Sequence, residues 1–171
     1  MKINVVVVGD LDENCYILEK DNKVLVIDPG DDIDKIKEII GDKEVVLVLV
    51  THNHFDHVGA LDYFDDSIIY RFDNLEERVY DILPFKFRVI FTPGHSLDSV
   101  SYYFEEDNVL FGGDFIFYRS IGRWDLAGGN YASMLESIDK IKKYPINMVI
   151  YPGHGISTVL KDEIRYNGYF R

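Results

Sequence analysis

The segment THNHFDH, residues 51–57, determines how the rest of the sequence is interpreted. It holds three of the five histidines of the chain, together with an aspartate. Side chains two residues apart in an extended segment point the same way, so His52, His54 and Asp56 are expected to converge on one side. If a helix begins near Asp56, the side chain of His57 points in a neighbouring direction. One short loop can then supply ligands to two metal ions, because neutral imidazole and carboxylate are common ligands of zinc and of non-haem iron.

The other two histidines and a further aspartate also follow strand-like runs. FRVIF, NVLF and NMVIY lead into TPGH, GGD and PGH, which contain His95, Asp114 and His154. Loops at strand ends, held by a rigid sheet, are where functional groups are usually placed. An isolated His-x-His pair is more often part of a solvated loop, but this repeated placement favours a metal site.

Short apolar runs bounded by Gly, Pro, Asp or Asn predict strands along the whole chain. They cover residues 3–8, 15–19, 23–27, 45–50, 67–70, 87–91, 99–104, 108–111 and 147–151. The spacing of apolar residues predicts helices over 32–41 and 130–144, with a third after His57 and a short fourth near Ser157. Strands in runs with helices between them indicate α+β or α/β layers in which helices cover the sheets.

Length and composition predict one globular domain, residues 1–171. There are 18 basic and 30 acidic residues, and the net charge of −12 argues against nucleic acid and anionic membranes as partners. The single cysteine, Cys15, allows no internal disulfide, which fits a reducing compartment. Nothing reads as a signal peptide or a membrane span, so a cytoplasmic location is expected. The sequence gives no sign of the oligomeric state.

Residues 51–57 and the later histidine, aspartate and histidine resemble the metallo-β-lactamase superfamily. Its pattern is a strand, then T-H-x-H-x-D-H, then loops that give His, Asp and His in that order. The resemblance begins at NCYIL (14–18) and VIDPGD (26–31) and covers most of the chain. It implies an α+β fold, a four-layer αβ/βα sandwich of two mixed sheets with helices outside and the metals at one edge, between the sheets.

The resemblance also implies roles for individual residues. His52, His54 and His95 would hold one divalent ion, Asp56, His57 and His154 a second, and Asp114 would bridge the two. The ions are expected to be zinc, with iron or manganese as alternatives. Asp28, in IDPG, corresponds to a residue that steadies the histidine loop from behind, although it also reads as an ordinary turn residue.

Within the superfamily, GGDFIFYRSIGRWDLAGGN (112–130) is similar to the small glyoxalase II-like hydrolases. This similarity implies a metal-activated hydroxide that attacks the carbonyl of a small-molecule thioester or ester, with Asp56 orienting the nucleophile. Arg123 is a candidate contact for a substrate carboxylate, and an ion pair with Asp125 is the alternative. A glyoxalase II carries a C-terminal helical domain that binds glutathione. This chain ends 17 residues after His154, so no such domain is expected.

Alternatives to this reaction remain open. Trp124 and Asp98 depart from the pattern of these hydrolases, which leaves the substrate undecided, and a lactone is one alternative. A persulfide dioxygenase-like oxidoreductase would use a single iron at positions that match His52, His95 and Asp114. The full set of ligands for two metals favours hydrolysis. A metal-binding protein without catalytic activity is the remaining alternative.

Overall fold

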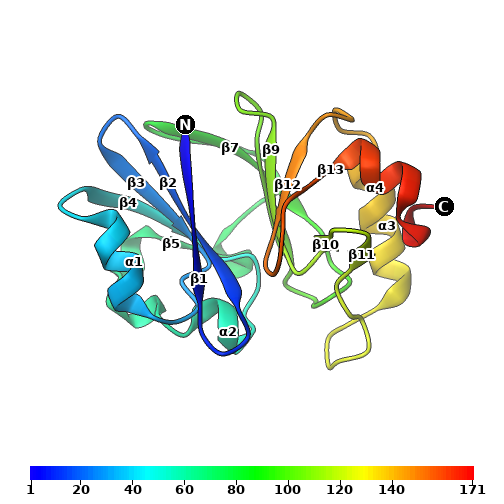
Figure 1. Cartoon of the computed structure of the whole chain (residues 1–171), viewed down its shortest axis with the longest axis horizontal. Helices are drawn as coiled ribbons and strands as arrows, with labels where there is room; N and C mark the ends of the chain where they lie inside the picture. The colour runs from blue at the N-terminus through cyan, green and yellow to red at the C-terminus, as the bar shows by residue number, and fades with distance from the viewer.

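The computed structural model describes residues 1–171 as two β-sheets packed face to face, with helices on the outer faces (Figure 1). The first sheet has the strand order β1-β2-β3-β4-β5. Its first three strands are antiparallel and its last three are parallel. These strands are β1 (Lys2–Val8), β2 (Glu13–Lys20), β3 (Lys23–Ile27), β4 (Glu44–Leu49) and β5 (Ile69–Tyr70).

The second sheet has the order β13-β12-β9-β8-β7-β6, with the β12–β9 pair parallel and the other pairs antiparallel. Its strands are β6 (Val79–Ile82), β7 (Phe85–Phe91), β8 (Val100–Phe104), β9 (Val109–Gly113), β12 (Val149–Pro152) and β13 (Thr158–Val159). A small hairpin, β10 (Ile116–Phe117) and β11 (Ser120–Ile121), follows β9. Both sheets are therefore mixed.

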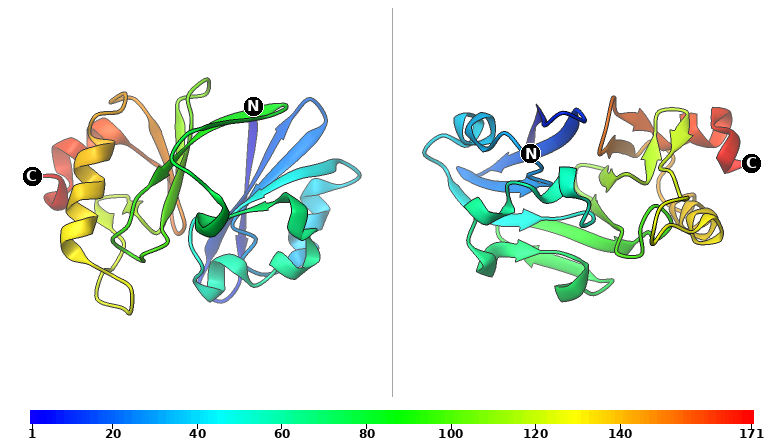
Figure 2. Two further views of the ribbon diagram at one scale, coloured as in Figure 1. Left: turned by 180° about the vertical axis from the view of Figure 1, so that it is seen from behind. Right: turned by 90° about the horizontal axis from the view of Figure 1, so that it is seen from below.

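The helices complete the layers. α1 (Ile33–Ile40) covers the first sheet, whereas α3 (Tyr131–Ile141) and α4 (Leu160–Tyr166) cover the second (Figures 1 and 2). The short α2 (Phe55–Val58) lies at one end of the sandwich. Four 3₁₀ turns cover Leu61–Tyr63, Asp66–Ile68, Phe72–Asn74 and Gly168–Phe170. No helix is both long enough and apolar enough to cross a membrane.

Three apolar clusters hold the layers together. The central one joins the inner faces of the two sheets, with Leu25 and Leu47 from the first and Phe87 from the second. A second cluster lies under α1, where Ile36 is fully buried, and a third lies under α3, where Ile138 is buried. Each fully buried side chain of this kind contributes about 1.5–3 kcal/mol. The α+β, four-layer sandwich expected from the sequence is confirmed.

Two local expectations differ from the structure. The helix predicted after His57 stops at Val58, because the Ala60 amide donates to the carbonyl of Pro29 instead of continuing the helix. Four strands were not predicted, namely β6, β10, β11 and β13. Each has only two to four residues, which is too few to show the alternation that marks a strand.

Candidate metal centre

The residues singled out from the sequence meet at one end of the sandwich. The segment 51–57 follows β4, whereas His95, Asp114 and His154 follow β7, β9 and β12. These loops lie at the lower edge of the molecule in Figure 1, beside α2. The two sheets therefore bring together side chains that are far apart in the sequence.

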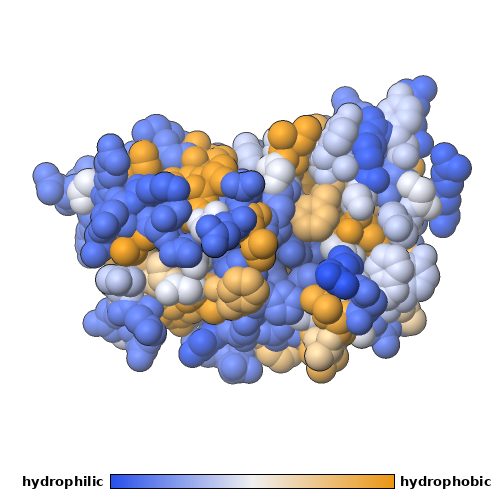
Figure 3. All heavy atoms as spheres, turned by 60° about the horizontal axis from the view of Figure 1, so that its bottom comes forward, coloured by the Kyte–Doolittle hydropathy of each residue, from blue (hydrophilic) through white to orange (hydrophobic).

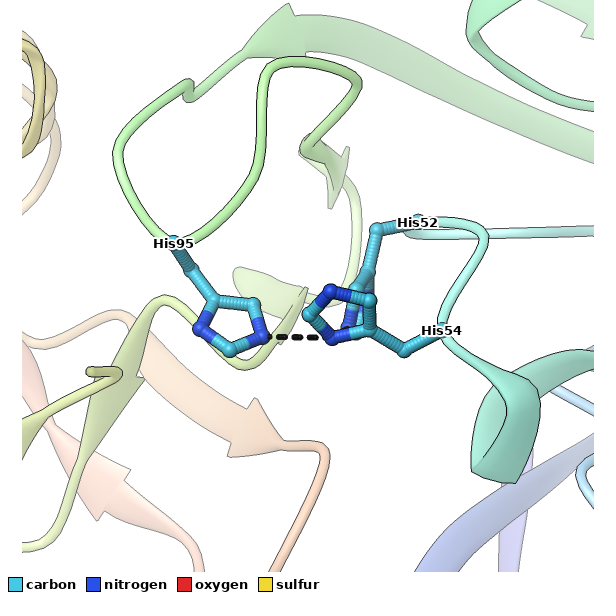
Figure 4. A group of neighbouring side chains, drawn as sticks. All are labelled: His52, His54 and His95. Carbon is cyan, nitrogen blue, oxygen red and sulfur yellow. Dashed lines mark hydrogen bonds between the residues drawn. The ribbon is translucent and has the colours of Figure 1, made fainter. Parts of the chain in front are cut away.

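The donor atoms form overlapping clusters, within each of which they lie within 4.8 Å of one another. Figure 4 shows the imidazoles of His52, His54 and His95 turned toward one another. Nδ1 of His54 lies 3.1 Å from Nε2 of His52 and 2.9 Å from Nε2 of His95. There are three other clusters, namely Asp56, His57 and His154; His52, His57 and Asp114; and Glu13, Asp28 and His57.

Asp114 lies between these groups. Its Oδ1 is 3.5 Å from Nε2 of His57 and 3.6 Å from Nε2 of His154. Its Oδ2 is 3.5 Å from Nε2 of His95. The two oxygens of one carboxylate thus face two different sets of nitrogens.

Two buried polar atoms at this point have no hydrogen-bond partner, Nε2 of His57 and Oδ1 of Asp114. A buried polar atom without a partner costs about 1–3 kcal/mol, so such atoms are rare unless a ligand satisfies them. A metal ion is a partner that both an imidazole nitrogen and a carboxylate oxygen accept. The residues present therefore fit a metal site.

The protonation states also suit metal binding. Burial lowers the pKa of His52 and of His54, and neighbouring imidazoles lower both further. Burial alone would raise the pKa of Asp114, but its contacts with His57 outweigh burial and hold that pKa well below its usual range. At neutral pH the lone pairs of His52 and His54 are therefore free, and Asp114 is ionised.

Asp28 lies behind the cluster and holds its loop. Its Oδ1 accepts a hydrogen bond from the Thr51 amide at 2.7 Å, and its Oδ2 accepts one from the Thr51 hydroxyl at 2.6 Å. Nδ1 of His57 donates to the same Oδ2 at 2.9 Å. Burial would lower the pKa of His57, but Asp28 and Asp114 together outweigh burial and raise that pKa. Asp28 thereby turns the unpartnered Nε2 of His57 toward Asp114.

Two glycines beside the centre leave no room for a side chain. A Cβ at Gly153 would lie 2.3 Å from Oδ1 of Asp114 and 2.7 Å from Cε1 of His57. Gly113 has a φ of +53°, and a Cβ there would lie 2.2 Å from Oγ1 of Thr51. No side chain fits at either position, so the backbone of Gly153 directly approaches two donor residues and that of Gly113 approaches Thr51.

The sequence model of the metallo-beta-lactamase superfamily matches residues 8–72 and 70–154, a span that includes every one of these donor residues. The chain belongs to the metallo-beta-lactamase superfamily.

Relatives of similar length come from several bacteria. The probable metallo-hydrolase YqgX of Bacillus subtilis is 33% identical over 99% of this chain and 97% of that protein. The hydroxyacylglutathione hydrolase GloC of Haemophilus influenzae is 27% identical over 99% of this chain and 98% of that protein. Both relatives are named as hydrolases.

Solved structures of the superfamily match the whole fold. The crystal structure of BLEG-1 B3 metallo-beta-lactamase matches with a TM-score of 0.92, 30% identity and coverage of 99% of both chains. The crystal structure of TTHA1623 in a di-iron-bound form matches with a TM-score of 0.88 at 29% identity, covering 97% of this chain and 99% of that one.

One residue beside the metal centre of this chain could not be recognised as part of it from the sequence. Glu13 is only 1% exposed, and neither oxygen of its carboxylate has a hydrogen-bond partner. Its Oε1 lies 3.7 Å from Nδ1 of His57. Burial, and then the charge of Asp28, raise the pKa of Glu13 to about 10, so this side chain is neutral near pH 7. Its burial depends on the hairpin of β1 and β2 packing over the PGH loop, where the Asn14 amide donates to the Gly153 carbonyl at 2.7 Å.

Glu13→Gln is expected to stabilise the metal-free protein by about 2–3 kcal/mol at pH 7. The unfolded chain ionises Glu13 above its usual pKa of 4.5, whereas the folded protein keeps it protonated up to a pKa of about 10. Between these values the folded state binds the extra proton, so the free energy of unfolding falls as pH rises. Glutamine has no proton to lose and removes this slope.

Urea unfolding of chelator-treated protein from pH 5 to 9 measures this effect. Glu38→Gln, at an exposed position of α1, is the matched control and should keep the slope of the parent protein. Parallel pH profiles for the Glu13→Gln variant and the parent would mean that folded Glu13 is ionised.

Arg123 is engaged within its own loop. Its Nε and Nη2 donate to the two carboxylate oxygens of Asp125, each at 2.9 Å. Its carbonyl accepts a hydrogen bond from Nδ1 of His95 at 2.7 Å, so the backbone of Arg123 helps to orient one imidazole of the centre. A contact between its guanidinium and a substrate stays a prediction from the sequence.

Proposed function

We propose that this protein is a binuclear metal-dependent hydrolase that cleaves a thioester or an ester. Water adds to the carbonyl carbon, the bond from that carbon to sulfur or oxygen breaks, and a carboxylic acid and a thiol or alcohol leave. The observation that carries the proposal is the placement of Asp114, whose two oxygens face two separate sets of donors. Hydroxyacylglutathione hydrolases among the relatives support the choice of a thioester.

The donor sets define where two ions would bind. His52, His54 and His95 would hold one, Asp56, His57 and His154 the other, and Asp114 would be shared. Two divalent ions bound there supply a water of lowered pKa and polarise the carbonyl that is attacked. We propose zinc, and the di-iron form of TTHA1623 makes iron the first alternative, ahead of manganese.

The chain itself holds the donors in place. Nδ1 of His154 donates to the carbonyl of Leu11 at 3.0 Å, and Nδ1 of His95 donates to that of Arg123. With Nδ1 of His57 bonded to Asp28, three imidazoles are fixed so that Nε2 faces the centre. Each is fixed through one nitrogen and turned to the donor sets through the other, which leaves none of the three as a general base.

Asp56 is the group that we assign to orienting the attacking water. Its Oδ2 lies 3.3 Å from Nε2 of His154, so its carboxylate reaches the second donor set. A carboxylate accepts hydrogen bonds through both oxygens, so one oxygen can serve as a ligand while the other accepts from water. The single-iron oxygenase considered above would give Asp56, His57 and His154 no role, which favours the hydrolase.

Hydrolysis of S-lactoylglutathione by the purified protein, with metal content measured on the same sample, tests the proposal. We expect two metal ions per chain and hydrolysis of a thioester or ester that chelation removes and added metal restores. If S-lactoylglutathione is not cleaved, other thioesters, esters and lactones are tested as substrates. One iron per chain, with no hydrolysis of any of these substrates, would contradict the proposal and favour oxidation of a persulfide.

A further inference from the structure

Large apolar side chains stand exposed around the metal centre, although most apolar residues of the chain are buried. Their exposed fractions run from 51% for Tyr118 to 76% for Phe55. We call this group the apolar rim, and its members are Leu11, Phe55, Leu97, Tyr118 and Ile156.

Each member of the apolar rim lies close to a donor residue. Phe55 stands between two of them in sequence, and Leu97 and Ile156 each follow a histidine of the centre by two residues. The carbonyl of Leu11 is the hydrogen-bond acceptor for His154. Tyr118 follows Phe117, whose ring centroid lies 6.4 Å from that of His154.

Two members of the rim also line one groove. Leu11 and Phe55 form its apolar walls, the groove has a volume of about 370 Å³, and it reaches Asp56. Figure 3 brings this end of the molecule forward and shows hydrophobic groups on both halves, beside the furrow where the halves meet. A substrate whose carbonyl reaches the metal centre therefore has apolar surface next to it.

The same region offers no free cation for an anionic substrate. The residues that line the groove include three aspartates and neither lysine nor arginine. The guanidinium of Arg119 donates to the carbonyl of Asp162 at 3.2 Å and lies 4.1 Å from the ring centroid of Tyr166. Arg123 is paired with Asp125. Apolar contact is thus the attraction that the rim can provide, and burying apolar surface is favourable wherever it occurs.

We propose that the apolar rim selects an aliphatic acyl chain, so that the preferred substrates are thioesters or esters of unbranched fatty acids with an uncharged leaving group. This inference rests on the proposed hydrolase function. It gives the exposed side chains a role that a glutathione conjugate, with its carboxylates, would not use. A second copy of the chain is the other occupant that an exposed apolar surface could have, and the experiment separates the two.

The first measurement is hydrolysis of S-acyl-N-acetylcysteamine thioesters from acetyl to octanoyl by the metal-loaded protein. We expect kcat/KM to rise about two- to fourfold for each added methylene, since each one loses contact with water at the rim. Phe55→Ser and Leu11→Ser should flatten this dependence without changing metal content. Ile146→Ser is the matched control, because Ile146 is 61% exposed at the opposite end of β12 and should leave the dependence unchanged.

The second measurement needs no turnover. Straight-chain acyl hydroxamates from aceto- to octanohydroxamate chelate metal ions, and their affinities can be measured by calorimetry on the same samples. Affinity that rises with chain length in the parent protein, but not in Phe55→Ser, supports the rim proposal. This holds even if no thioester is cleaved, and only the proposed hydrolysis then fails. A flat series for the hydroxamates overturns the rim proposal, whether or not thioesters are hydrolysed. A Phe55→Ser variant that converts a dimer to a monomer and keeps the full chain-length dependence would make this surface an interface between two copies, and would also overturn it.

Discussion

Asp114→Asn is expected to remove hydrolysis while leaving the fold in place. The substitution keeps the size of the side chain but removes the charge that faces both donor sets. Because we propose this carboxylate as a ligand shared by both sites, metal content should fall below two per chain. The value of kcat/KM should fall by about a thousandfold or more, as expected when an electrostatic component of a catalytic centre is lost.

Metal analysis, circular dichroism and hydrolysis assays on one sample test this expectation. Asp139→Asn is the matched control, because it makes the same chemical change on the exposed side of α3, where the Asp139 carboxylate accepts a hydrogen bond from Nζ of Lys142. An Asp114→Asn protein that kept two metals and full activity would show that the carboxylate lies near the centre without taking part in it.

Asp28→Asn is expected to weaken both the fold and the centre. Asp28 is buried, and its two oxygens accept three hydrogen bonds from Thr51 and His57. Asparagine tolerates the left-handed backbone, with φ of +50°, that Asp28 adopts, so the turn itself should survive. The loss of charge removes the carboxylate bonded to Nδ1 of His57, while Asp114 still faces Nε2. It is expected to cost about 3 kcal/mol, the lower end for breaking a buried ion pair. Metal affinity should fall about 10- to 100-fold, because the imidazole is no longer held.

Urea unfolding and chelator competition measure the two parts of this effect. Thr51→Ser keeps the hydroxyl that donates to Asp28, so it should lose little stability and little metal affinity. Thr51→Val should lose one hydrogen bond, and its losses of stability and metal affinity should be intermediate. If Asp28→Asn lowered stability but bound metal as tightly as the parent protein, Asp28 would serve the turn alone.

The sequence predicts the convergence of the donors because each one follows a strand end. His95, Asp114 and His154 are separated by long stretches of chain, yet the strands before them belong to one sheet and end on the same side. The short motifs identify the donor residues, and the layered fold brings these residues together. The sequence allows two interpretations of Asp28, and the structure shows it both at a left-handed turn and in contact with His57.

Features that depend on contacts between distant segments could not be predicted in this way. Glu13 reads as an ordinary residue before a strand, and only the pairing of its hairpin with the PGH loop buries it. Leu11 and Phe55 carry no local sign of exposure, since leucine and phenylalanine usually lie in cores. The edge strand β6 contains Asp81 and covers only four residues, so no periodic pattern marks it.

Each donor set described above draws on both sheets. His54 follows a strand of the first sheet and His95 a strand of the second, and the same division separates His57 from His154. A bound ion would therefore tie distant parts of the chain together, as a disulfide does in a secreted protein, and would remove freedom from the unfolded state in the same way. With a single cysteine the chain cannot make a disulfide within itself. Chelators, and not reductants, would remove this cross-link. The stability of the folded chain would then depend on the supply of metal instead of on the thiol–disulfide balance.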